Sequence, residues 1–154
     1  MRNFNESDKK KKRARIHIEE NPGNLSKELL ANLEGKVKVS LKDGYLSCPV
    51  AWKIARESNV PKIAIGEIAD RLGIRITNCQ IGCFKVEKTT HDAPTQDNAD
   101  DKTITMLEAL RENNELTCAK VFELGQQLRL TPMAIADIAN LRNWKIRRCQ
   151  LGCF

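Results

Sequence analysis

The chain has 154 residues, of which 41% are hydrophobic and 30% charged, and its formal net charge is +6. This length allows one domain or two small ones, and no apolar run approaches the roughly 20 residues of a membrane-spanning helix. The polar, basic N-terminus lacks the apolar core of a secretory signal, so we expect a cytoplasmic protein with reduced thiols. The positive charge suits an anionic partner such as nucleic acid but does not identify one.

The first 23 residues carry a run of like charges. The run consists of Lys9, Lys10, Lys11, Lys12 and Arg13. Such a run repels itself and is usually a solvated, mobile tail. We therefore interpret residues 1–23 as a flexible basic tail, with contact to nucleic-acid phosphate as the alternative.

From residue 24 the pattern becomes helical. Leucines recur at helical spacing up to Leu33, and Gly35 marks the predicted end of this helix. The next residues, 36–41, alternate like a strand. Their counterparts later in the chain, Ile104 to Arg111, carry apolar residues at helical spacing. We predict a helix at Ile104 to Arg111 and leave residues 36–42 undecided between helix and strand.

Two short helices and a strand are predicted next. Ser47 is a good N-cap residue for the first helix, as is Thr117 at the matching place in the second half. A break at Asn59-Val60-Pro61 precedes the second helix, for which Gly73 suits the C-cap. Ile74-Arg75-Ile76 alternates as a short strand does, and so does its counterpart Trp144-Lys145-Ile146.

The chain contains an internal duplication. Cys79-Gln80-Ile81-Gly82-Cys83-Phe84 returns as Cys149-Gln150-Leu151-Gly152-Cys153-Phe154, and at the same offset Cys48 matches Cys118. We interpret the chain as two domains in series rather than a solenoid. The predicted repeats are residues 24–84 and 103–154, joined by a linker at residues 85–102 that lacks periodicity.

Residues 54–68 carry a family resemblance. The segment Ile54-Ala55-Arg56-Glu57-Ser58-Asn59-Val60-Pro61-Lys62-Ile63-Ala64-Ile65-Gly66-Glu67-Ile68 resembles the helix-turn-helix of the Lac-repressor type. In that pattern Ala55 lets the helices approach, Asn59 takes the turn, and Val60 and Ile65 are the buried contacts. The second repeat keeps Gly125, Leu130 and Ile135 but has Arg129 at the turn. The resemblance implies a mainly α fold of two small helix-turn-helix or winged-helix units with short β segments.

The same resemblance implies which residues face DNA. It offers the second helix to the major groove, with Pro61, Lys62, Ile63, Gly66 and Glu67 exposed. Lys62 alone among these is a convincing donor to a base. Other basic residues are candidates for contacts to the phosphate backbone, which position a protein without specifying sequence. These are Arg71, Arg75, Arg142, Lys145, Arg147 and Arg148.

The cysteines are the candidate metal or redox residues. They are Cys48, Cys79 and Cys83 in the first repeat and Cys118, Cys149 and Cys153 in the second. Three thiolates suit a soft metal, and a structural zinc site needs four ligands. The fourth could come from the partner unit, water, His17 or His91. An iron–sulfur cluster, a redox disulfide within each Cys-x-x-x-Cys tail and simple core packing of the cysteines are the alternatives.

Two functions remain open on the sequence. The first is a tandem helix-turn-helix DNA-binding regulator with cysteine-based metal or redox sensing. The second is an adaptor that binds metal or an iron–sulfur cluster and docks on a partner protein rather than DNA, since a fold does not determine a function. We expect no enzyme, because both histidines lie outside the repeats and no glycine-rich phosphate loop follows a predicted strand. The pattern leaves the oligomeric state undecided.

Overall fold

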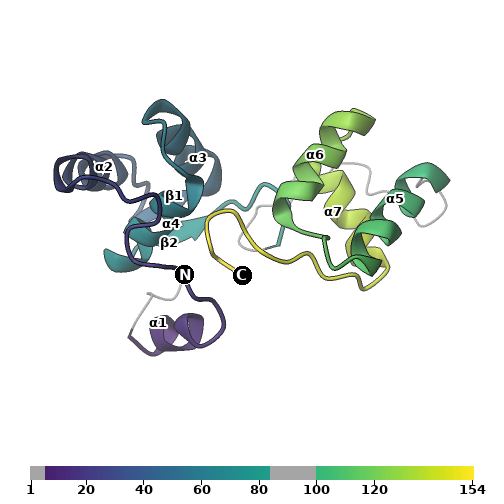
Figure 1. Cartoon of the computed structure of the whole chain (residues 1–154), viewed down its shortest axis with the longest axis horizontal. Coiled ribbons are helices and arrows are strands. Elements are labelled where there is room, and N and C mark those ends of the chain that lie inside the picture. Colours follow the sequence, from purple (N-terminus) through teal and green to yellow (C-terminus); the bar gives the residue numbers. More distant parts are fainter. Residues whose placement is uncertain (1–5, 84–99) are drawn as a thin grey trace. The chain divides into compact units, whose positions relative to one another are not determined.

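The computed structural model describes residues 6–83 and 100–154, which are mainly helical and include a short two-stranded parallel sheet (Figure 1). Packing divides the chain into two compact units. The first unit contains the chain up to Cys79 together with Gln150–Phe154, and the second contains Gln80–Cys149. The predicted boundaries of 24–84 and 103–154 follow the repeat in the sequence, whereas this division follows contacts.

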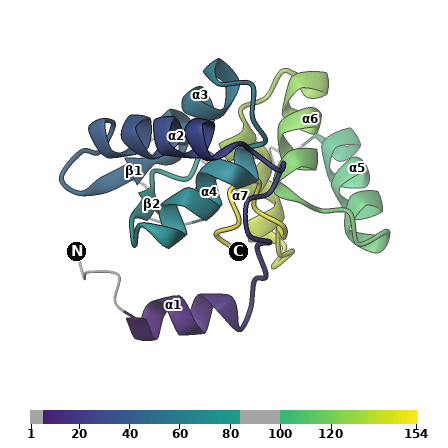
Figure 2. The same ribbon diagram turned by 60° about the vertical axis from the view of Figure 1, so that its left-hand side comes forward.

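The first unit is built from helices around one parallel strand pair. Its elements are α1 (Glu6–Arg13), α2 (Lys27–Val39), β1 (Tyr45–Ser47), α3 (Cys48–Glu57), α4 (Lys62–Arg71) and β2 (Arg75–Thr77). Helix α2 packs against α3 and α4, and these two pack closely on each other (Figures 1 and 2). In the sheet, Leu46 pairs with Ile76 and Ser47 with Thr77. Leu46, Ile65 and Ile68 are fully buried and form the centre of the core.

Helix α2 does not end at Gly35, so that expectation is wrong. The helix continues to Val39, which makes the undecided segment 36–42 helical over its first part. It continues because Leu33 and Val37, four residues apart, are both fully buried on one helical face. Gly35 itself is exposed, and a Cβ placed on it would meet nothing within 4 Å.

The basic run near the N-terminus lies in α1 rather than in an extended segment. Lys12 donates from Nζ to both carboxylate oxygens of Asp70 on α4, at 2.5 and 2.6 Å. Both side chains are partly shielded, with exposed fractions of 16% and 29%. At least one charge of the run therefore serves packing within the first unit.

The turn between α3 and α4 has the geometry that a close helix pair needs. Asn59 takes a left-handed conformation with φ of 51°, which asparagine tolerates better than most residues. The Val60 amide donates to the carbonyl of Ala55 at 3.0 Å. Ala55 is buried, as its small side chain in the predicted pattern requires.

The second unit contains α5 (Asp101–Glu112), α6 (Cys118–Leu128) and α7 (Pro132–Leu141), so the helix predicted at Ile104 to Arg111 is confirmed. Helix α7 packs against both α5 and α6 (Figure 1). The strand expected at Trp144-Lys145-Ile146 is absent from the described structure. A single parallel bridge joins Thr117 to Arg147 instead. Only Ile146 is buried in residues 144–148, whereas both Ile76 and Thr77 are buried in β2. A strand in this segment is therefore supported by less side-chain burial.

The turn between α6 and α7 repeats the same local geometry. Arg129 is left-handed with φ of 54°, and the Leu130 amide donates to the carbonyl of Gly125 at 2.9 Å. A Cβ on Gly125 would lie 2.8 Å from the Leu130 carbonyl oxygen. The close approach of the chain at this turn therefore requires glycine at residue 125.

Matched N-cap positions differ in their hydrogen bonds, which gives a test. The Thr117 hydroxyl accepts from the Lys120 amide at 3.3 Å, whereas the Ser47 side chain makes no cap hydrogen bond. We expect Thr117→Ala to destabilise α6 by about 1 kcal/mol, and Ser47→Ala to destabilise α3 by less than about 0.5 kcal/mol. Amide hydrogen exchange resolved to each helix measures both losses. Equal losses in the two helices would contradict the assignment of the cap.

Candidate functional site

The six cysteines differ in accessibility, and all are thiols in the structure. Cys48, Cys79 and Cys118 are buried, Cys149 and Cys153 are half-buried, and Cys83 is exposed. Cys48 is the first residue of α3 and Cys118 the first of α6.

In each unit, backbone pairing brings two of the cysteines to the same end of a strand pair. Cys48 directly follows Ser47, which pairs with Thr77, and Cys79 comes shortly after Thr77. In the second unit the Cys118 amide donates to the carbonyl of Arg147 at 3.0 Å, and Cys149 comes shortly after Arg147. Parallel pairing therefore brings together chain segments whose cysteines lie far apart in the sequence.

The third cysteine of each predicted set belongs to the other unit. Cys153 lies in the first unit with Cys48 and Cys79, and Cys83 lies in the second. The predicted sets grouped cysteines by repeat, whereas packing groups them across repeats. The sequence could not distinguish these possibilities, because the two tails have nearly the same residues.

The described thiols are not gathered into one group with other metal-ligand side chains. Zinc needs four ligands around one point, and a cluster held by three cysteines needs three. Among the described residues, no three or more histidine, cysteine, aspartate or glutamate side chains form a group that could hold a metal ion. His17 is exposed, and His91 lies outside the described residues. Metal binding therefore stays a prediction.

Metal content is measured directly. Elemental analysis and an absorption spectrum of protein purified without oxygen report zinc or an iron–sulfur cluster. A stoichiometric metal that is lost in Cys79→Ser would show that the thiols converge in solution. Metal-free protein with six titratable thiols would remove the prediction.

The face of α4 that was expected to read bases is covered by the chain's own C-terminus. Lys62 lies over the ring of Trp52 at 3.9 Å and donates from Nζ to Oε1 of Gln150 at 2.9 Å. Gly66, which was expected to be exposed, is buried, and a Cβ on it would lie 2.7 Å from the carbonyl carbon of Leu151. The expectation of an open recognition face is therefore wrong for the centre of this helix.

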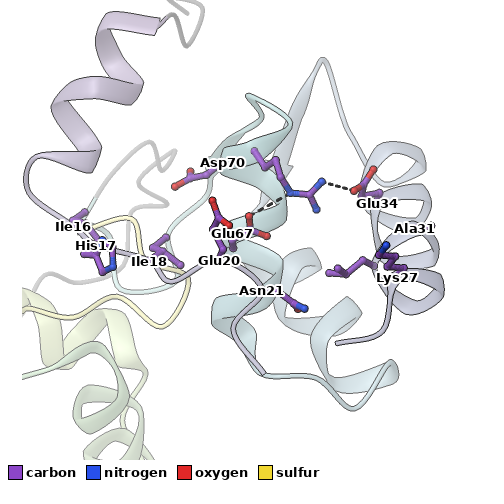
Figure 3. Close-up of a pocket in the computed structure, with 12 residues that line it drawn as sticks. Ile16, His17, Ile18, Glu20, Asn21, Lys27, Ala31, Glu34, Glu67 and Asp70 are labelled. Carbon is purple, nitrogen blue, oxygen red and sulfur yellow. Dashed lines mark hydrogen bonds and ion pairs between the residues drawn. The ribbon is translucent and has the colours of Figure 1, made fainter. Parts of the chain in front are cut away.

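Arg71, a predicted phosphate contact, is held by two carboxylates. It donates to Glu34 at 2.6 Å and to Glu67 at 3.3 Å, as the dashed lines in Figure 3 show. The hydrogen bond that Arg71 donates to Glu34 is the main cause that raises the pKa of Arg71 above its usual value. This network borders a cavity of about 720 Å³ between α2, α4 and the segment around Ile18 (Figure 3). Its carboxylates make the cavity unsuited to phosphate.

The other predicted backbone contacts fall into two groups. Arg75 is half-buried on β2, and Arg142 is half-buried beside the ring of Trp144, at 5.8 Å. Lys145, Arg147 and Arg148 are exposed on the segment that follows α7. Phosphate contact by these three residues stays a prediction, and sequence spacing alone could not separate them from the paired and half-buried cations.

No family model, no curated protein and no solved structure matches the chain. In the part of the chain that the structure describes, none of the helices has the length and apolar character needed to cross a membrane. The function is therefore argued from the residues of this chain.

The accessibility of the cysteines predicts an order of reaction. With iodoacetamide under native conditions, we expect Cys83 to react first, Cys149 and Cys153 next, and Cys48, Cys79 and Cys118 at least about tenfold more slowly, because access limits thiol chemistry. Mass spectrometry of digests taken over time gives each rate. Fast reaction of the buried thiols in folded protein would contradict their placement.

Proposed function

We propose that this chain is a tandem helix-turn-helix regulator that binds DNA mainly through the phosphate backbone, with its cysteines as metal- or redox-responsive groups. One observation carries the proposal. Lys145, Arg147 and Arg148 present three exposed cations within one short segment directly after the second helix pair. Cations so placed neutralise phosphates and release counterions, which supplies most non-specific affinity.

The geometry of both helix pairs supports the helix-turn-helix part of the proposal. Each pair turns through one left-handed residue, and the next amide donates back to a small residue in the first helix. In the first unit that small residue is Ala55, and in the second it is Gly125. A tight turn of this kind lets the second helix cross the first closely, as in the DNA-binding motif.

Backbone binding is proposed rather than sequence reading because α4 presents little to a base. Its convincing donor, Lys62, is engaged by Trp52 and Gln150. Glu67 and Asp70 on the same helix carry charges that repel phosphate, although Arg71 and Lys12 offset them. Contacts to phosphate position a protein on DNA without specifying sequence.

A second candidate is the adaptor that docks on a partner protein. The covered face of α4 favours it, because this helix contacts the peptide segment Gln150-Leu151-Gly152. The two candidates differ in their need for exposed cations. Loss of the cations after α7 should weaken DNA binding but leave an adaptor's protein contact intact.

The DNA proposal is tested by salt dependence. We compare the native chain with a variant carrying Lys145→Gln, Arg147→Gln and Arg148→Gln, titrated against random duplex DNA at two salt concentrations. Affinity of the native chain should fall as salt rises. Removing three phosphate contacts should make the slope of log affinity against log salt shallower by up to about 2.7.

A charge-matched control separates local contacts from net charge. Lys38→Gln, Lys42→Gln and Lys102→Gln remove three exposed cations from other places. We expect this control to keep most of the native slope. Equal losses in the two triple variants would show that net charge alone acts, and no binding of the native chain at low salt would leave the adaptor as the better candidate.

A further inference from the structure

The two compact units exchange their C-terminal tails. The division between units falls after Cys79 and again after Cys149, which are equivalent positions in the two repeats. The first unit therefore contains the tail of the second repeat, and the second unit contains the described part of the tail of the first. Each unit is completed by residues from the other repeat.

We propose that α4 forms a peptide-binding surface for a Gln-aliphatic-Gly segment, and that Gln150-Leu151-Gly152 occupies this surface reversibly. The chain's own tail is the ligand, bound within one molecule. The consequence for DNA rests on the proposed function, because the tail covers the helix that a helix-turn-helix protein places in the major groove. The binding of the tail itself rests on contacts alone.

The glutamine is recognised by a cation with an aromatic support. Lys62 donates to the side-chain carbonyl oxygen of Gln150 at 2.9 Å. The same ammonium lies 3.9 Å from the centre of the Trp52 ring, a cation–π distance that holds the lysine in place. A glutamine supplies the acceptor that this ammonium needs, whereas an aliphatic residue would supply none.

The aliphatic residue and Gly66 fit each other. The backbone of Leu151 passes over Gly66 so closely that a Cβ at residue 66 would clash with the Leu151 carbonyl oxygen. The Leu151 side chain is fully buried. Glycine within a helix costs about 1 kcal/mol relative to alanine, so its presence at Gly66 is explained by the tail and not by α4 itself. Gly35 in α2 has no such neighbour.

The last recognition element is the glycine of the tail. Gly152 has φ of 66°, a conformation that glycine adopts easily. A Cβ on Gly152 would lie 3.0 Å from Cδ1 of Ile63 and would clash with Ile18. In Figure 3 the ribbon of the C-terminal tail runs beside Ile18. Ile63 and Ile18 thus form a narrow channel that admits backbone without a side chain.

The second unit binds the equivalent tail of the first repeat less tightly. There Ile81 is buried and Gly82 has φ of 73°, next to Met133 at the position equivalent to Ile63. A Cβ on Gly82 would lie 3.7 Å from Met133, which is an ordinary contact. Pro132 and Ala136 stand where Lys62 and Gly66 stand in the first unit. The selective surface is therefore the one on α4.

The test compares Gly66→Ala with the matched control Gly35→Ala in the full chain. The readout is the rate at which iodoacetamide alkylates Cys153, measured on the tryptic peptide 149–154 and normalised to Cys83. We expect Gly66→Ala to raise this rate by about tenfold, and Gly35→Ala to leave it unchanged, because added volume is not accommodated at a packed contact. Circular dichroism checks that both variants keep their helices. An unchanged rate in folded Gly66→Ala protein would overturn the proposal.

A second experiment applies if Gly66→Ala fails to fold. A peptide with the sequence of residues 149–154, with serine for both cysteines, is added to the native chain, and Cys153 alkylation is measured again. The peptide should raise the rate in a saturable way at millimolar concentration, because it competes with a tethered ligand. A peptide with alanine at its glycine position should have no effect. Equal effects of the two peptides, or none from either, would overturn the proposal.

These experiments contain no DNA, so their outcome is independent of the proposed function. If Gly66→Ala releases the tail and the chain still fails to bind DNA, the peptide surface stands and the DNA proposal fails. If DNA binds while Cys153 reactivity is unchanged in every variant, the DNA proposal stands and the tail proposal fails.

Discussion

The contact between the backbone of Leu151 and Gly66 is the constraint on which the arrangement of the first unit depends. It fixes the tail close enough to α4 for Gln150 to reach Lys62 and for Gly152 to pass Ile63. It also buries Leu151 completely, which contributes roughly 1.5 to 3 kcal/mol. Replacing the hydrogen of Gly66 by a methyl group would disturb all three contacts together.

The exchange of tails adds buried apolar side chains to two small units. The units have 84 and 70 residues, and units this small bury a limited fraction of their surface and are marginally stable by themselves. Here each unit gains an aliphatic residue from the other repeat, Leu151 in the first and Ile81 in the second. Because both units belong to one chain, the tails act at a high effective concentration. The stability of each unit is therefore coupled to the presence of the other repeat.

Local patterns predicted the parts of the fold that local sequence determines. Ala55, Asn59 and Ile65 indicated a tight helix pair, and each has the burial or dihedral angle that this role requires. Val60, which was expected to be buried, is only half-buried, and its counterpart Leu130 is exposed. Gly35 misled the prediction because glycine is a local stop signal, whereas burial of Val37 is a tertiary effect that overrides it. The parallel pairing of β1 with β2 could not be inferred from the local sequence either, because two helices separate the strands along the chain.

The regrouping of the cysteines could not be predicted for a related reason. A repeat in sequence shows which residues are equivalent, but not whether a tail packs on its own repeat or on the other one. One signal was available and was not used. Gly66 stands in the middle of a helical pattern where alanine stands in the second repeat, at residue 136. An unexplained glycine inside a helix indicates close approach of another backbone.

The two units differ in what their surfaces offer, although their sequences correspond. In the first unit Lys62, Arg71 and Lys12 are all engaged by partners within the unit. In the second, Lys145, Arg147 and Arg148 are exposed, and Pro132 removes the cation that would hold a tail. The three predicted DNA contacts that follow α7 are therefore exposed, whereas Lys62 and Arg71 on α4 are engaged in internal contacts. The proposed contact with an anionic partner therefore lies in the second unit, and the proposed reversible binding of the tail that carries Cys153 lies in the first.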